Sequence, residues 1–280
     1  MIAEKAARRI RLAIIYLLAA VLLFWTLFPI YWLIISSFKP TREIIGRFPT
    51  FWPGRWVIGH YASILTSRSF VRSLANSIYI STGATLVTIF LSLLAGYAIS
   101  RLKMKGKQLM SQFVLFTYLI PLFMLFIPFY IVLSKFGLTN KTESLFLVYP
   151  VLCIPYATWI FISYLKSIPH ELEEAAFLDG YSRFAIIMRI VTPLAAPGIM
   201  ATAIYTFTRI WNDYLMAFML ISSPSRFTIM LAVADLIIGD QVAWGKLFAA
   251  SVIASIPVTV IYFIAGRQIT SGLTAGAVKQ

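Results

Sequence analysis

Long apolar stretches alternate with short polar links along the whole chain. Six stretches contain no Asp, Glu, Lys or Arg: Leu12–Phe38, Ser73–Ser100, Gln108–Ser134, Ser144–Leu165, Ile190–Thr208 and Leu247–Gly266. Each reaches or nearly reaches the ~20 residues that cross a bilayer as a helix. The pattern predicts an all-α integral membrane protein with six transmembrane helices, the fifth extending past Arg209 toward Ile221. An even number of spans places both termini on one side.

The composition supports a membrane protein. The chain has 280 residues, of which 60% are hydrophobic and 12% charged, and this is too apolar for a soluble domain. A net charge of +14 is also compatible with nucleic-acid binding. The basic residues nevertheless lie in short clusters between apolar runs, and membrane topology explains that distribution better.

Short loops rich in Lys and Arg stay in the cytoplasm. Such clusters precede span 1 and link spans 2 and 3: Lys5, Arg8, Arg9 and Arg11, then Arg101, Lys103, Lys105 and Lys107. Both termini are therefore predicted to be cytoplasmic. The predicted segments are a cytoplasmic N-terminus (1–11), span 1 (12–38), an external loop (39–72), a five-span core (73–266) with polar loop 167–193, and a cytoplasmic tail (267–280).

The loop between spans 4 and 5 predicts a helix, a turn and a second helix. Pro169 suits a first helical turn, and Ser167 is placed to cap it. Three glutamates follow where the helix dipole favours negative charge, namely Glu171, Glu173 and Glu174. Gly180 suits the left-handed end of this helix, and Ser182 is placed to cap the next.

The second helix of this loop has one predicted apolar face. Its members follow helical spacing: Phe184, Ile187, Met188 and Val191. Pro193 is expected to end the helix. On these residues alone, an amphipathic loop resting on the membrane surface is one interpretation.

A second interpretation comes from a family resemblance. Glu174-Ala175-Ala176, three residues, Gly180, nine residues, Ile190, one residue, and a position before Pro193 resemble the cytoplasmic coupling motif of binding-protein-dependent ABC importer permeases. The Leu usual before the proline is Thr192 here. The resemblance implies that loop 169–193 docks on an ATPase subunit. The implied coupling residues are Glu174, Ala175, Ala176, Asp179, Gly180, Ile190 and Pro193.

Span 5 carries a second polar cluster. Arg209 lies 16 residues beyond Pro193, about 24 Å along a helix and hence in the outer half of the bilayer. A charge at that depth is expected to face protein or a water-filled cavity. Arg209 and Asp213 are spaced to pair on one helix face. A structural ion pair and a substrate-facing role both remain open, and Arg209, Asn212 and Asp213 are the candidates for a substrate path.

Two further segments sharpen the resemblance. Trp211-Asn212-Asp213 and the C-terminal run from Ser271 to Lys279 are similar to the carbohydrate-uptake branch, in particular to the shorter permease of the maltose-type pair. The resemblance implies a multi-pass protein of a prokaryotic plasma (inner) membrane that imports a sugar, oligosaccharide or polyol by alternating access. The implied partners are a second, non-identical permease, two ATPase subunits and an extracytoplasmic solute-binding protein.

The sequence favours a transport subunit over an enzyme. Gly106-Lys107 lacks the glycines and the Ser or Thr of a phosphate-binding loop, so no cofactor is expected in this chain, and ATP and Mg²⁺ are expected on partner subunits. No metal site is expected, because His60 and His170 fall on opposite predicted sides. The alternative function is an ion-driven secondary carrier, but no internal repeat is evident and Asp213 is the lone acidic residue near a span.

Prolines and small residues predict how the spans pack. Pro121 and Pro128 in span 3, and Pro150 and Pro155 in span 4, predict kinked helices around a central path. Gly83, Gly96 and several Ser and Thr residues of span 2 predict close helix packing. In the external loop, Trp52 and Trp56 are expected to be interfacial anchors, with sugar stacking as the alternative.

Overall fold

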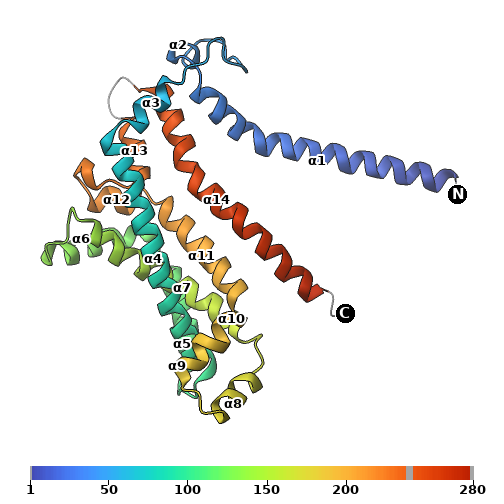
Figure 1. Cartoon of the computed structure of the whole chain (residues 1–280), viewed down its shortest axis with the longest axis vertical. Helices are drawn as coiled ribbons and strands as arrows, with labels where there is room; N and C mark the ends of the chain where they lie inside the picture. The colour runs from blue at the N-terminus through green and yellow to red at the C-terminus, as the bar shows by residue number, and fades with distance from the viewer. Residues whose placement is uncertain (1, 238–241, 278–280) are drawn as a thin grey trace. The chain divides into compact units, whose positions relative to one another are not determined.

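The computed structural model describes residues 2–237 and 242–277, and every regular element within these residues is helical (Figure 1). The α-helices are α1 (Ile2–Ser37), α2 (Thr41–Ile44), α3 (Gly59–Leu65), α4 (Arg68–Arg101), α5 (Lys107–Tyr118), α6 (Phe126–Lys135), α7 (Thr142–Leu165), α8 (Glu171–Leu178), α9 (Arg183–Ile186), α10 (Thr192–Leu194), α11 (Ala196–Trp211), α12 (Leu215–Leu220), α13 (Ile229–Asp235) and α14 (Trp244–Ala277). Two 3₁₀ turns, η1 (Leu122–Leu125) and η3 (Pro224–Arg226), and one π-helical segment, η2 (Ile187–Val191), complete the set.

Four helices are long and apolar enough to cross a membrane. They are Arg8–Ser37, Arg68–Arg101, Thr142–Leu165 and Trp244–Ile264. Two further candidates are bent pairs, Lys107–Tyr118 with Leu122–Lys135 at 92° and Arg183–Leu194 with Ala196–Trp211 at 82°. The predicted all-α class is therefore confirmed for the described residues, with four spans, or six if each bent pair is one span.

The predicted third span is broken rather than kinked. Proline lacks an N–H, and it disfavours helical geometry in the residue before it. At Pro121 the backbone is extended, with ψ of 128°, so α5 ends at Tyr118 and η1 starts a new direction. Helix α7, by contrast, continues through Pro150 and Pro155 without a break.

Helical structure also extends into three predicted non-span segments. The N-terminal segment 1–11 is helical from Ile2, because its Ala, Arg and Lys residues are good helix formers. External loop 39–72 contains α2, α3 and the start of α4. The predicted tail 267–280 is helical up to Ala277, and its last three residues, including Val278 and Lys279 of the C-terminal resemblance, lie outside the described residues.

The chain divides into two compact units, Met1–Ser67 with Val233–Ser255 and Arg68–Ala232 with Ile256–Gln280. In the first unit a buried lysine joins the end of α1 to the following loop. The Lys39 ammonium donates to the Thr50 carbonyl and lies 4.2 Å from the centre of the Trp32 ring. Burial lowers the pKa of Lys39, and the Glu43 carboxylate opposes this shift. The His60 ring contacts the Lys39 carbonyl at 3.0 Å and so adds α3 to the same cluster.

Trp52 and Trp56 form a pair on the surface of the first unit. Their rings lie 5.5 Å apart in an edge-to-face arrangement, and 62% and 50% of the two residues are exposed. An exposed aromatic pair suits both an interfacial anchor and a sugar-stacking platform, so both interpretations remain predictions.

The second unit is built on α4, which packs along α7 and α11 (Figure 1). The buried face of α4 includes many small residues beside a few large ones; the small ones include Ser73, Ser77, Ser81, Ala84, Thr88, Ser92 and Gly96. A Cβ atom added at Gly96 would lie 2.8 Å from Phe161 Cβ of α7. The structure thus confirms that the small residues of this span serve close packing.

We expect Gly96→Ala to destabilise the α4–α7 contact. The added methyl meets the first side-chain atom of Phe161, which cannot move without its backbone, so the cost should be about 1–3 kcal/mol. Thermal unfolding of the purified chain in detergent measures this. Gly59→Ala is the matched control, because its nearest neighbour would be 3.9 Å away and its stability should stay within about 0.5 kcal/mol. Equal melting temperatures of the two variants would contradict the close-packing account.

Candidate functional site

The predicted helix, turn and helix of loop 167–193 are present. Gly180 has φ of 86° and ends α8, with Gly180 N–H donating to the Phe177 carbonyl and Tyr181 N–H to the Ala176 carbonyl, each at 3.1 Å. Ser182 then caps α9, because its hydroxyl accepts from Ala185 N–H at 3.3 Å. Gly180 and Ser182 therefore end one helix and cap the next, as the sequence predicts.

The predicted start of the first helix is wrong. Helix α8 begins at Glu171 after His170, which makes no side-chain cap, and Pro169 precedes the helix rather than lying in its first turn. The Ser167 hydroxyl instead donates to the Tyr164 carbonyl at 2.7 Å. Ser167 lies just after α7, and both its hydroxyl and its backbone N–H donate to the Tyr164 carbonyl, so it serves the end of the preceding helix.

The predicted apolar face of the second helix is confirmed at Ile187 and Val191, which are buried, and at Met188, which is half-buried against the same core cluster. It is wrong at Phe184, which is 57% exposed, while Ile186 is buried instead. The π-helical segment η2 widens the turn, so regular α spacing does not hold across it. Pro193 lies within α10, and the bend of 82° follows at Ala195.

Most residues implied by the coupling motif are accessible. The exposed members are Glu174, Ala175, Asp179, Gly180 and Pro193, and Ile190 is half-buried. Ala176 is only 5% exposed and packs in a core cluster with Leu93 and Tyr97 of α4. Ala176 therefore joins α8 to the protein, while Glu174 and Ala175 form part of its free surface.

The sequence analysis missed a buried ionic cluster beside this segment. Arg101 Nε lies 2.7 Å from Glu173 Oε1, and the Tyr97 hydroxyl donates to Glu173 Oε2 at 2.8 Å. Arg101 Nη2 also donates to the Ile168 carbonyl at 2.7 Å. The sequence indicates only that Arg101 belongs to a cytoplasmic basic cluster and that Glu173 is a favourable charge near a helix start. The available signal was helical spacing, because Glu173 shares a face with the small residue Ala176.

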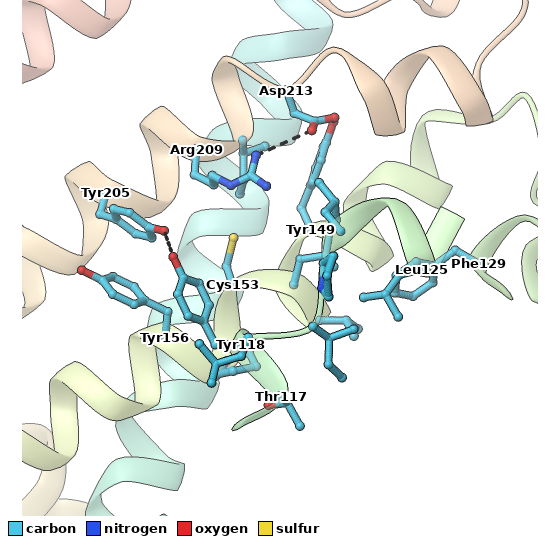
Figure 2. Close-up of a pocket in the computed structure, with 18 residues that line it drawn as sticks. Thr117, Tyr118, Leu125, Phe129, Tyr149, Cys153, Tyr156, Tyr205, Arg209 and Asp213 are labelled. Atoms are coloured by element: carbon cyan, nitrogen blue, oxygen red, sulfur yellow. Dashed lines mark hydrogen bonds and ion pairs between the residues drawn. The ribbon is translucent and has the colours of Figure 1, made fainter. Parts of the chain in front are cut away.

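A cavity of about 540 Å³ lies in the second unit at the break of span 3 (Figure 2). Its walls come from α5, η1, α6, α7 and α11, and they include Pro121 in the break between α5 and η1. The lining residues are Thr117, Tyr118, Leu119, Ile120, Pro121, Leu122, Leu125, Phe129, Tyr149, Val151, Leu152, Cys153, Pro155, Tyr156, Tyr205, Arg209, Ile210 and Asp213. Broken backbone at membrane depth is tolerated where it lines such a cavity.

Three tyrosines form one wall of this cavity. The Tyr156 and Tyr205 rings are 4.1 Å apart, and Tyr118 lies 5.2 Å from Tyr156 (Figure 2). The Tyr118 and Tyr205 hydroxyls are 2.9 Å apart. The wall thus offers ring faces and hydroxyls together, which suits a ligand with both apolar C–H groups and hydroxyls.

Arg209 and Asp213 pair in the cavity, as their spacing predicts. Arg209 Nη1 lies 3.7 Å from Asp213 Oδ2, and the two side chains are 44% and 4% exposed. Asp213 Oδ1 accepts from the Tyr149 hydroxyl at 3.1 Å and from Met216 N–H at 2.9 Å. Asn212 is exposed and is not among the lining residues. Asp213 is therefore buried and hydrogen-bonded, and Arg209 is the more exposed member of the pair.

Comparisons with known proteins identify the family of the chain. Residues 88–274 match the family described as binding-protein-dependent transport system inner membrane component. The chain belongs to this family. The permease is 36% identical over 262 residues to the inner membrane ABC transporter permease protein YcjP of Escherichia coli (strain K12), covering 93% of this chain and 94% of that protein. It is 33% identical over 279 residues to the trehalose/maltose transport system permease protein MalG of Thermococcus litoralis, covering 99% of each.

A solved structure supports the fold. The permease matches a chain of a bacterial ABC transporter involved in the import of the acidic polysaccharide alginate, with a TM-score of 0.81 and 20% identity, covering 92% of this chain and 96% of that chain. The relatives are named as permeases, which confirms the expected transport subunit and disfavours an enzyme or an ion-driven carrier. The permease is thus a multi-pass inner-membrane component of a binding-protein-dependent importer.

We expect Asp213→Ala to destabilise the permease by about 1–3 kcal/mol, because it leaves Met216 N–H and the Tyr149 hydroxyl without their buried acceptor. Asp213→Asn should cost less, since an amide oxygen can still accept both bonds. Thermal unfolding in detergent separates the variants. Asn212→Ala, at the adjacent exposed position, should leave stability within about 0.5 kcal/mol. An Asp213→Ala variant as stable as this control would refute the structural role.

Proposed function

We propose that the permease imports a sugar, oligosaccharide or polyol, with loop 169–193 as the docking site for an ATPase subunit. The observation that carries the proposal is that α4, α7 and α11 connect the exposed segment around Glu174 with the tyrosine-lined cavity. A movement imposed on the segment can therefore reach the cavity through packed helices. Closing of the ATPase dimer would then bias the cavity between its outward and inward openings.

The proposed topology has six spans. The bent pairs α5–α6 and α9–α11 each count as one crossing, so both termini and loop 167–193 lie in the cytoplasm. The lysine- and arginine-rich link between α4 and α5 supports this orientation. The exposed apolar side chains of α1 then face lipid or a second permease, because a helix with this surface needs an apolar environment.

The proposed partners follow from the same topology. An extracytoplasmic binding protein, as the family description implies, would deliver the solute to the outer face. A second, non-identical permease would complete the path, and two ATPase subunits would bind ATP and Mg²⁺, for which this sequence shows no phosphate-binding loop. Glu174 would make polar or ionic contacts with the ATPase, while Ala175 keeps the docking surface small and Gly180 permits the turn.

The chemistry of the cavity supports a carbohydrate. Tyrosine rings bind the C–H faces of sugars, and hydroxyls and a partly exposed arginine supply hydrogen bonds. The match to a trehalose/maltose permease supports the same class. Arg209, Asp213 and Asn212 remain proposed path residues, with Asn212 reaching solute only outside the cavity described above.

We expect Glu174→Lys to reduce recovery of the ATPase. The side chain is 70% exposed, so the permease itself should fold, while the reversed charge opposes the docking contact. The tagged permease is co-expressed with its partner subunits and extracted in detergent. The amount of copurified ATPase and its rate of ATP hydrolysis are then measured. Glu143→Lys gives the same charge change at the exposed start of α7, on the opposite predicted side, and should have no effect. Undiminished ATPase recovery with Glu174→Lys would reject the docking assignment.

We expect Tyr156→Ala to lower uptake of radiolabelled trehalose or maltose about tenfold, because it removes the ring that packs against both Tyr118 and Tyr205. The assay uses reconstituted vesicles with ATP and the binding protein. Tyr79→Ala is the control, because Tyr79 is 66% exposed and lies outside the cavity. Equal uptake by both variants would remove the tyrosine wall from the proposed path.

A further inference from the structure

Helix α8 is attached to α4 by a buried ionic cluster. Glu173 of α8 and Arg101 at the end of α4 are 2.7 Å apart, and their side chains are 5% and 9% exposed. The Tyr97 hydroxyl donates a hydrogen bond to the second Glu173 oxygen, Oε2. A second Arg101 nitrogen, Nη2, donates to the carbonyl of Ile168, which lies between α7 and α8. One guanidinium therefore connects the end of α4, the α7–α8 link and α8.

The two neighbouring glutamates of α8 have different surroundings. Glu174 is 70% exposed and lies 3.5 Å from the ring of His170, whereas the side chain of Glu173 is 5% exposed. Next to Glu173 on the inner face, Ala176 packs with Leu93 and Leu165 in an apolar cluster. The outer face of α8 is thus free for a partner, and the inner face is fixed to the core.

An ionic cluster at this position does more than add stability. Replacing a buried ion pair by apolar residues is often neutral or stabilising, so stability alone does not require it. Apolar contacts tolerate sliding, whereas charge-assisted hydrogen bonds fix distance and direction. The Tyr97–Glu173 hydrogen bond and the Arg101–Glu173 ion pair hold α8 in one position relative to α4. Helix α4 in turn packs along α7 and α11, which line the cavity.

We propose that Arg101, Glu173 and Tyr97 are positioning residues that transmit the displacement of α8 to α4. This inference rests on the proposed function, because it assigns the path by which ATPase movement enters the membrane helices. The cluster makes α8 and the end of α4 move as one body. Without it, α8 can still bind the ATPase through its outer face, but its movement is partly lost in sliding against α4.

The first test measures the attachment in the full chain without partners. Hydrogen exchange in detergent should be at least about fivefold faster at α8 amides in Glu173→Gln, because Arg101 then lacks its counter-ion. The double variant Arg101→Met/Glu173→Met, which removes both buried charges and should still fold, should show the same local increase. Glu174→Gln, on the outer face, is the control. Unchanged α8 exchange in the double variant would overturn the positioning role.

The second test measures coupling in the assembled importer. With the double variant in reconstituted vesicles, ATPase recovery should match wild type, while transported trehalose or maltose per ATP hydrolysed should fall about tenfold. This ratio does not change if the cluster only stabilises the fold. A wild-type ratio in the double variant would therefore refute transmission through the cluster.

The outcomes separate this inference from the proposed function. Failure of the wild-type chain to recover any ATPase would refute the proposed function. The hydrogen-exchange comparison would then still decide whether the cluster fixes α8. Tyr97→Phe, which removes one hydrogen bond and keeps the ion pair, should give an intermediate ratio, and a Tyr97→Phe loss as large as that of the double variant would contradict the leading role of the ion pair.

Discussion

Close packing between α4 and α7 is the constraint on which the second unit depends. Lipid chains are as apolar as leucine, so helices in a bilayer gain little from burying large apolar side chains against one another. Small residues allow close approach instead, as at Gly96 of α4, where an added Cβ would lie 2.8 Å from Phe161 Cβ. The same close contact occurs on α11, where a Cβ at Gly198 would lie 2.7 Å from the Tyr164 ring of α7. Three helices are thereby held at fixed distances, and both the cavity and the α8 segment are built on them.

The cavity arises where backbone continuity fails. The break at Pro121 turns the chain by 92° between α5 and η1, and the bend at Ala195 turns it by 82° before α11. Carbonyls and N–H groups released at such breaks must find partners within the protein or in water, because hydrocarbon supplies none. Pro121 therefore sets where a path can form, while α7, which continues without a break, contributes Tyr149 and Tyr156 to the lining of the cavity.

Local sequence rules predicted the elements of this fold, and long-range contacts limited them. Gly180 and Ser182 were predictable because a left-handed helix end and an N-cap depend on a few adjacent residues. The four continuous spans followed from apolar length. The predicted cap at Ser167 was wrong because its hydroxyl binds the end of the preceding helix instead of the start of the next one. The predicted burial of Phe184 was wrong because η2 departs from the regular α-helical period.

The partners of Arg101 and Glu173 could not be predicted, since 72 positions separate them and only tertiary packing brings them together. The same holds for the three tyrosines of the cavity wall, which come from α5, α7 and α11. Asn212 was predicted to line the path because it is next to Asp213 in the sequence motif. Asp213 lines the cavity, but Asn212 does not.

The charge balance of the cavity bears on what it can bind. Arg209 is its basic residue and Asp213 its acidic one, and they lie 3.7 Å apart, so their fields largely cancel at a distance. Tyr149 and Met216 both donate to Asp213 Oδ1, while Asp213 Oδ2 faces the Arg209 guanidinium. A wall without net charge, rich in rings and hydroxyls, favours hydroxylated neutral solutes. Ion-driven carriers use a titrating or coordinating group in the path, whereas the Asp213 carboxylate of this cavity is 4% exposed and paired with Arg209.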